Sequence, residues 1–359
     1  MTAFPRVLVT DDEDISVKSV IMVNSYNDNN IFWKNDVVTL TGYIIKFVEN
    51  HIDGPILKEF HQGNDQINYG YTDKGLGLSN SKDKINFSEL GTQLAYIYRF
   101  FASHVLIMGE LLLSSSGWAG IRYSPSKPPL TQNLGEMNRF IDSISSQHVA
   151  VTCFGGGPVS EVAALTAWLR TEGIYEPLLF NIVDKYSAWS CVAAEVARFC
   201  NVELHYKELD FLTTQIDDLL PYVSTMDIVC MSKFLSALTA HREAATRSLR
   251  YVLQNMRAGA ILVYVDNSGG GTTQWLSAEA AKADFNEVFT VPHYPARLSP
   301  AILAPNERRS LFNVKATSTL NVAFKVFLKK GRGYSPGFTG TSYCRSKFYH
   351  RIGDSCTSC

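Results

Sequence analysis

Apolar residues recur at intervals of three and four in the first part of the chain, which is the spacing of one face of an α-helix. In residues 36–52 this spacing links Leu40, Ile44 and Val48, and residues 89–113 repeat the pattern. Each of these segments is predicted to be a helix with one buried face. The stretch between them is rich in Gly, Asn and Asp over residues 61–84, and we expect a long loop there.

Further along the chain the pattern changes to short apolar runs that alternate with helical segments. Five runs that we predict to be strands begin at Val149, Pro177, Val202, Thr225 and Ala260, which are 23 to 35 residues apart. This spacing is typical of repeated strand–helix units. It predicts an α/β fold in which a parallel sheet is covered by helices on both faces.

Two more strand-like runs follow, at residues 285–291 and 321–330, and we expect them to form a hairpin at the edge of the sheet. The chain then divides into four parts. These are a polar leader (1–30), a mainly helical N-terminal domain (31–147), an α/β domain (148–330), and a basic, cysteine-containing tail (331–359). We expect the N-terminal domain to act as a cap that selects the substrate.

Composition bears on the size of the core and on the class of protein. Of the 359 residues, 46% are hydrophobic and 19% are charged, and the formal net charge is −1. The apolar content is sufficient for a large core and a second domain. A charge so close to zero gives no overall electrostatic signature of a nucleic-acid-binding protein.

The distribution of cysteines bears on the compartment. The start of the chain lacks the pattern of a signal peptide, and no uninterrupted apolar stretch has the length of a membrane span. Of the seven cysteines, four lie in apolar or helical contexts and three in the last sixteen residues, so a disulfide framework is not indicated. We expect a reducing compartment, the cytoplasm or the nucleus, and no membrane contact.

Three consecutive glycines, Gly155, Gly156 and Gly157, separate the first predicted strand from the helix that follows. Glycine permits backbone angles and close approaches that a side chain would block, and Pro158 suits the first turn of a helix. The N-terminus of that helix offers free N–H donors and a partial positive charge. The turn is therefore suited to a flat or negatively charged ligand.

Polar side chains follow three of the other predicted strands. Asp184 ends the second strand, where a carboxylate can accept hydrogen bonds from a ribose diol. Asp210 and Phe211 end the third unit, where an acid can accept from an exocyclic amine and a ring can stack. Ser232 and Lys233 end the fourth strand and would face the same crevice.

Each of these features also has a purely structural interpretation. The glycines can form a tight turn and nothing more. Asp184 and Asp210 can cap the helices that follow them, which is a common role of aspartate. Phe211 can belong to the core. The coincidence of the glycine turn with two acids in one regular series favours a nucleoside-binding site.

This series resembles the Rossmann-like (class I) S-adenosylmethionine-dependent methyltransferases over residues 149–330. The segments that carry the resemblance are VTCFGGGPVSE, LLFNIVDKYSAW, ELDF and MDIVCMSKFLSAL. It implies a mostly parallel, seven-stranded sheet whose last strand is antiparallel, with S-adenosylmethionine as cofactor. By position, the cofactor-binding residues are implied to be Gly155, Gly156, Gly157, Asp184, Asp210, Phe211 and Ser232.

The sequence departs from that family at two positions. Cys153 stands where an acid often precedes the glycines, and Val159 replaces a further glycine, while Glu161 is nearby as a substitute acid. In addition, CMSKF lacks the Asn/Asp-Pro-Pro-Tyr/Phe motif of the branches that methylate amino groups of adenine and cytosine. The sequence assigns no catalytic residue, acceptor or oligomeric state.

The tail contains Cys344, His350, Cys356 and Cys359, which could close a tetrahedral zinc site. The spacing is not a strong zinc fingerprint, so no metal is assigned. Six Lys or Arg residues and one Asp lie between Lys329 and Cys359. This basic tail could contact RNA or a protein partner, or could stay solvated.

Three functions remain open at this point. The first is a methyltransferase that acts by direct in-line displacement. The second is a catalytically silent methyltransferase-like protein that senses the cofactor or serves as a scaffold. The third is a nicotinamide-dependent oxidoreductase, which fits less well because Ser160 replaces the third glycine of G-x-G-x-x-G and Asp184 lies too far along the chain.

Overall fold

A mixed β-sheet forms the centre of the protein. The computed structural model describes residues 29–71, 85–117, 131–145, 148–175, 177–297, 314 and 319–331. Within these residues eight strands have the order β1-β7-β8-β6-β5-β2-β3-β4. They are β1 (Thr131–Gln132), β2 (Val149–Phe154), β3 (Leu178–Asp184), β4 (Glu203–Glu208), β5 (Ile228–Ser232), β6 (Ile261–Asn267), β7 (Phe285–Arg297) and β8 (Thr319–Lys329).

The helices occur before the sheet and between its strands. They are α1 (Asn29–Asn50), α2 (Gly54–Tyr71), α4 (Leu90–Ser115), α5 (Leu134–Ile144), α6 (Ser160–Thr171), α7 (Ser190–Cys200), α8 (Arg242–Asn255) and α9 (Thr272–Lys282). Three 3₁₀ segments, η2 (Ser187–Trp189), η3 (Ile216–Tyr222) and η4 (Leu235–His241), follow the carboxyl ends of β3, β4 and β5.

The predicted sheet topology is confirmed. Strands β2 to β6 are parallel, and β8 pairs antiparallel with both β6 and β7. The two last predicted strands form an antiparallel pair at one end of the sheet, as expected, with only the two-residue strand β1 beyond it. β8 is inserted between β6 and β7, and the two-residue strand β1 pairs with the outer side of β7. The apolar side chains of β8 require this interior position, since Val322 to Leu328 are buried.

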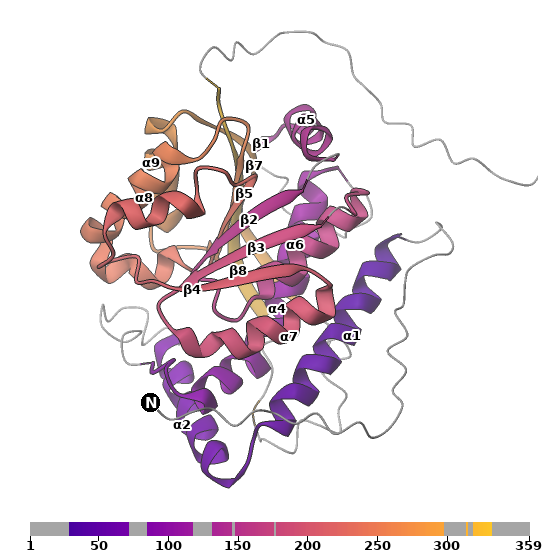
Figure 1. Ribbon diagram of the computed structural model, residues 1–359, viewed down its shortest axis with the longest axis vertical. Helices are drawn as coiled ribbons and strands as arrows, with labels where there is room; N and C mark the ends of the chain where they lie inside the picture. Colours follow the sequence, from indigo (N-terminus) through magenta and orange to yellow (C-terminus); the bar gives the residue numbers. More distant parts are fainter. Residues whose placement is uncertain are drawn as a thin grey trace, which may run out of the picture.

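Helices cover both faces of the sheet. One hydrophobic cluster joins α1, α2, α4, α6 and α7 to one face, and a second joins α8, α9 and the segments after β4 and β5 to the other. Figure 1 shows α8 and α9 on one side of the strands and α1, α6 and α7 on the opposite side. Because the first cluster includes residues of α1 and α4 as well as β2 and β3, the N-terminal helices share a core with the sheet.

The predicted loop at residues 61–84 is wrong in its first half, because α2 continues to Tyr71. Two glycines explain the helical packing there. A Cβ on Gly63 of α2 would lie 2.5 Å from the Cα of Thr92, and one on Gly91 of α4 would lie 2.4 Å from the Cβ of Glu59. The glycine taken as a loop former therefore allows the backbones of α2 and α4 to approach closely.

Helix α4 is the most deeply embedded helix of the N-terminal part. By length and composition it could cross a membrane, which the sequence interpretation did not recognise, but 83% of its most apolar window is buried within the protein. It packs on α1, α2 and α6. Core helices of this kind meet the same criterion, so α4 is no indication of a membrane span.

Candidate functional site

The strand order reverses between β2 and β5. The chain runs from β2 to β3 and β4 in one direction, and then crosses back to β5 and β6 in the other. Register pairs Cys153 with Cys230 and Phe154 with Met231, so the segments after β2 and β5 leave the sheet side by side. Ligands of open α/β sheets bind beyond the carboxyl ends of the strands at such a point.

Strained backbone marks both segments. Val159, the residue before α6, has a left-handed backbone with φ 53°, and Lys233 after β5 has φ 55°. For a β-branched residue such as Val159 this conformation is a genuine outlier. Hydrogen bonds hold both in place, from the Val159 N–H to the Gly156 carbonyl at 2.8 Å and from the Lys233 N–H to the Val265 carbonyl at 2.7 Å. Such strain is concentrated at functional sites.

Two aromatic side chains of the chain itself occupy the space beside the glycines. A Cβ on Gly155 would lie 2.2 Å from Cδ2 of Phe234, and one on Gly157 would lie 2.5 Å from Nε1 of Trp189. No side chain could be accommodated at either position without moving a ring. The absence of side chains at these glycines lets Phe234 and Trp189 approach the backbone closely, and the predicted room for a ligand stays a prediction.

Asp184 connects the second strand of the series to the glycine turn. Its Oδ2 accepts the Gly157 N–H at 3.1 Å and its Oδ1 accepts the Tyr186 N–H at 3.0 Å. The residue is only 9% exposed. Burial raises the pKa of Asp184 to about 6, although both hydrogen bonds oppose that shift. The structure therefore brings two of the predicted cofactor elements into direct contact.

Asp210 and Phe211 have clear local roles. The Leu212 N–H donates to Oδ1 of Asp210 at 2.9 Å, which closes a turn of the backbone. Phe211 is buried, and its ring centroid lies 5.5 Å from that of Phe154 and 5.0 Å from that of Phe234. These contacts agree with the structural interpretation of both residues. Their predicted position beside an adenine stays a prediction.

Glu161 is a buried acid of this site to which the sequence interpretation gave no role beyond substituting for the acid missing at Cys153. It lies in the first turn of α6 and is 2% exposed. Burial raises the pKa of Glu161 to about 7, and hydrogen bonds from the Ser232 and Ser160 hydroxyls act against this shift. The nearby carboxylate of Asp184 raises it further. Ser232 is buried at the end of β5, and its predicted contact with the cofactor stays a prediction.

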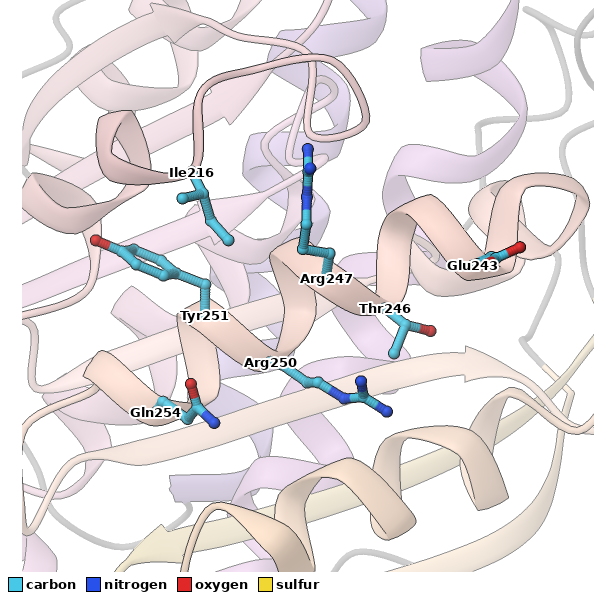
Figure 2. A pocket seen from close by; sticks show the side chains of 7 residues that line it. All are labelled: Ile216, Glu243, Thr246, Arg247, Arg250, Tyr251 and Gln254. Atoms are coloured by element: carbon cyan, nitrogen blue, oxygen red, sulfur yellow. The ribbon is translucent and has the colours of Figure 1, made fainter.

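A hollow lies on the face of the sheet that α8 and α9 cover. It measures about 410 Å³ and opens to solvent between η3 and α8. Its walls are formed by Ile216, Glu243, Thr246, Arg247, Arg250, Tyr251 and Gln254. Figure 2 shows the side chains of Arg247, Arg250 and Tyr251 diverging from α8. No predicted site residue is among the seven, so this cleft is separate from the glycine turn.

The predicted zinc ligands of the tail, Cys344, His350, Cys356 and Cys359, lie outside the described residues. Residues 1–28 of the predicted leader and residues 332–359 of the tail lie outside them too. Among the residues that the structure describes, no group of three or more His, Cys, Asp or Glu side chains could hold a metal ion.

No protein-family model matches the chain, and no curated protein matches its sequence. Three solved structures illustrate what it is similar to. The N-methyltransferase NodS from Bradyrhizobium japonicum WM9, in complex with S-adenosyl-L-homocysteine, has 11% identity and a TM-score of 0.32 over 62% of this chain and 99% of that one. A SAM-dependent methyltransferase from Methanosarcina mazei has 12% identity and a TM-score of 0.34, over 54% and 98%. The 16S rRNA methyltransferase KamB has 15% identity and a TM-score of 0.34, over 55% and 94%.

The strand order of this chain identifies its fold. From β2 to β8 the order and directions are those of a Rossmann-like methyltransferase sheet. Five parallel strands lie side by side, and the antiparallel strand β8 separates them from the sixth parallel strand, β7. The predicted fold class is therefore confirmed. The short strand β1 is an addition at the edge.

Proposed function

We propose that this chain is a methyltransferase that uses S-adenosylmethionine and transfers the methyl group by direct in-line displacement. The observation that supports this most is the bond from the Gly157 N–H to the Asp184 carboxylate at the switch point of the sheet. It joins the glycine turn to an acid in the position where nucleoside-binding sheets hold a ribose.

The residues that would hold the cofactor fit its chemistry. Each carboxylate oxygen of Asp184 accepts one backbone N–H and retains a lone pair for a ribose hydroxyl. The backbone of Gly155 to Gly157 would lie along the amino-acid part. When bound, the cofactor supplies a methyl group already activated on a sulfonium. The protein then contributes alignment and exclusion of water.

Binding requires a movement at the glycine turn. Phe234 is half-buried and lies on Gly155, whereas Trp189 is 3% exposed and packs against Phe87 and Tyr96. We therefore propose that the Phe234 ring leaves the turn when the cofactor binds, while Trp189 remains in the core. This is an equilibrium between a closed and an open turn, which the ligand shifts.

A second candidate is a methyltransferase-like protein that does no chemistry and acts as a cofactor sensor or a scaffold. The position of Phe234 on Gly155 favours it, as do the departures at Cys153 and Val159. In a scaffold the closed turn would be the permanent state, whereas in a sensor cofactor would bind without turnover.

Isothermal titration with S-adenosylhomocysteine separates these functions. A methyltransferase or sensor should bind it, and Asp184→Ala should weaken binding at least tenfold, whereas Asp218→Ala on the exposed segment η3 should not. The absence of heat from folded wild type and from folded Phe234→Ala would refute both and leave the scaffold. Methylated product from a panel of acceptors then distinguishes enzyme from sensor.

Two further parts of the proposal concern partners. The N-terminal helices, which share a core with the sheet, would select the acceptor. The basic tail would contact RNA or a protein, in the cytoplasm or the nucleus. Methyl transfer by chains with and without residues 332–359, compared on the same acceptor, tests the role of the tail.

A further inference from the structure

The cleft between η3 and α8 contains no residue of the glycine turn, and the proposed function gives it no role. Its volume of about 410 Å³ lies within the range of small-molecule sites. Six of its seven lining residues come from α8, and Ile216 of η3 adds an apolar wall. All six residues of α8 carry polar groups, so the cleft is suited to a polar ligand.

The helix that forms the floor of this cleft is fixed to the protein core. On its inner face Ala245, Leu249 and Val252 are buried. The Ser248 hydroxyl, also on that face, donates to the Phe211 carbonyl at 2.8 Å. The side chains on the outer face of α8 therefore project from a backbone that cannot easily shift, which favours a preformed site.

Arg250 is the best-oriented cation of the cleft. Its Nε donates to Oε2 of Glu279 at 2.6 Å, and its Nη2 donates to Oε1 of the same carboxylate at 3.1 Å. Glu279 is only 5% exposed, whereas the Arg250 side chain is 51% exposed. The two N–H groups of Nη1 take no part in this pairing and can donate to a ligand. A guanidinium held in this way is well suited to a phosphate or carboxylate.

Two hydroxyl groups of the cleft are available only as acceptors. Thr246 donates its proton to the Arg242 carbonyl at 2.6 Å. Tyr251 donates its proton to Oδ1 of Asp217 at 2.9 Å. Thr246 lies four residues before Arg250 on the same stripe of the helix, and Figure 2 shows both side chains on one side of α8. A ligand whose anionic group lies at Arg250 must therefore bring donors, such as hydroxyl groups, to the oxygen beside it.

We propose that this cleft binds a hydroxylated oxyanion, a small molecule that carries a phosphate or carboxylate group close to hydroxyl groups. Arg250 holds the anionic group, and Arg247, which is exposed one turn before it, adds a second positive charge. The hydroxyl groups of the ligand donate to the oxygens of Thr246 and Tyr251. Glu243 lies at the other end of the lining and repels the anionic group, so the ligand has one preferred direction. This is a second ligand site, beyond the proposed function.

Isothermal titration with three matched sugars tests the proposal. They are ribose 5-phosphate, its carboxylate counterpart ribonate, and neutral ribose. We expect saturable binding of an anionic sugar and no binding of ribose, and the tighter of the two anions identifies the head group. The titrations are made with saturating S-adenosylhomocysteine and repeated with Asp184→Ala, because the sugars could otherwise occupy the predicted ribose site. Neither condition should change the affinity of the cleft.

Two substitutions with matched controls locate the ligand. Arg250→Lys keeps the charge but loses the oriented Nη1 group, and it should weaken binding by about tenfold or more. Arg257→Lys is the control, since Arg257 also pairs with a buried carboxylate, Asp227, but outside the cleft. Thr246→Val should weaken the sugar anion by about twofold to tenfold and leave inorganic phosphate unaffected. Thr171→Val, which loses the equivalent hydroxyl bond in α6, should change neither.

Four results would overturn the proposal. These are no saturable binding of either anion, equal binding of ribose, displacement by S-adenosylhomocysteine, and unchanged affinity in Arg250→Lys. If Arg250→Lys does not fold, the exposed variant Arg247→Gln decides instead, and unchanged affinity there would have the same meaning. The titration involves no methyl transfer. A negative result therefore leaves the proposed function in place, and a failure to bind S-adenosylhomocysteine leaves this site in place.

Discussion

The ring of Phe234 lies directly on the backbone of Gly155, so that a Cβ on the glycine would come within 2.2 Å of the ring. The two residues are far apart in sequence and meet because β2 and β5 are neighbours in the sheet. The glycine turn is therefore closed by the segment that follows β5. Whether the turn opens depends on movement of the Phe234 side chain rather than on the glycines.

Replacement of Phe234 by Ala should increase affinity for S-adenosylhomocysteine. Only molecules with an open turn can bind, so the observed association constant is the intrinsic one multiplied by the open fraction. Removal of the ring abolishes that loss of affinity. We expect a gain of about tenfold by isothermal titration, with a loss of about 1–3 kcal/mol in stability because ring contacts with Phe211 and Phe154 disappear.

Phe199→Ala is the matched control, since Phe199 is also partly buried but lies on α7 against Tyr43. It should change stability and leave affinity unaltered. Weaker binding by Phe234→Ala would mean that the ring is a contact of the ligand and not a cover of the turn.

Gly157→Ala should destabilise the fold even without a ligand. The new methyl group would meet the indole of Trp189, which is 3% exposed and cannot easily move. Overpacking of this kind costs about 1–3 kcal/mol. Urea denaturation of Gly157→Ala, Trp189→Leu and the double variant should give a favourable coupling energy between the two positions.

Gly135→Ala in α5 is the control, because a Cβ at this position would lie 3.6 Å from its nearest neighbour, the side-chain Oδ1 of Asn133. It should retain or gain stability, since alanine favours helix more than glycine does. A fully stable Gly157→Ala that has lost only ligand affinity would assign this glycine to the cofactor alone.

Glu161→Gln should change how stability depends on pH. The folded-state pKa of Glu161 is about 7, above the ordinary value of 4.5, so the neutral acid is the form that folding favours. Its stabilising effect is complete below about pH 4.5 and is lost as the pH rises through about 7. Relative to Glu161→Gln, the wild type should lose up to about 3 kcal/mol of unfolding free energy over this window.

Chemical denaturation of both proteins at a series of pH values measures this difference. Glu279→Gln should give the opposite sign. Ion pairs with Arg250 and Lys282 lower the pKa of Glu279 to about 2, so its contribution is present above about pH 4.5 and is lost on acidification. Parallel pH profiles for wild type and Glu161→Gln would contradict the burial of an ionisable acid at this position.

Asp227→Asn should separate a structural carboxylate from Asp184. Asp227 is 4% exposed at the other end of the sheet, where its Oδ2 accepts the Ala150 N–H at 2.8 Å and its Oδ1 pairs with Arg257. We expect a stability loss of about 1–3 kcal/mol and unchanged affinity for S-adenosylhomocysteine. A loss of affinity comparable to that of Asp184→Ala would show that unfolding, not a ligand contact, explains both.

The parallel core of the sheet was predictable because each of its strands is a short apolar run with a helix after it. Val149 to Phe154 was predicted to the residue, and the other parallel strands within about three residues. β1 was missed because two residues carry no periodicity. The first half of the predicted loop at 61–84 was wrong because Gly63 looked like a loop former, whereas its function is contact with α4.

The chemistry of the site was less predictable for a physical reason. Burial of Glu161 comes from elements that the local sequence does not reveal, including β5 with Ser232. Rings such as Phe234 and Trp189 come to the glycines from other units, so only the three-dimensional fold relates them to the turn.

The place of β8 has a consequence for biosynthesis. This strand is the last that the structure describes, yet it lies inside the sheet between β6 and β7. While the ribosome is still translating Thr319–Lys329, the apolar strand β6 has an unpaired edge and β7 has no partner on its inner side. Exposed strand edges promote association between nascent chains. Chains released before Lys329 should therefore aggregate rather than form a smaller folded protein.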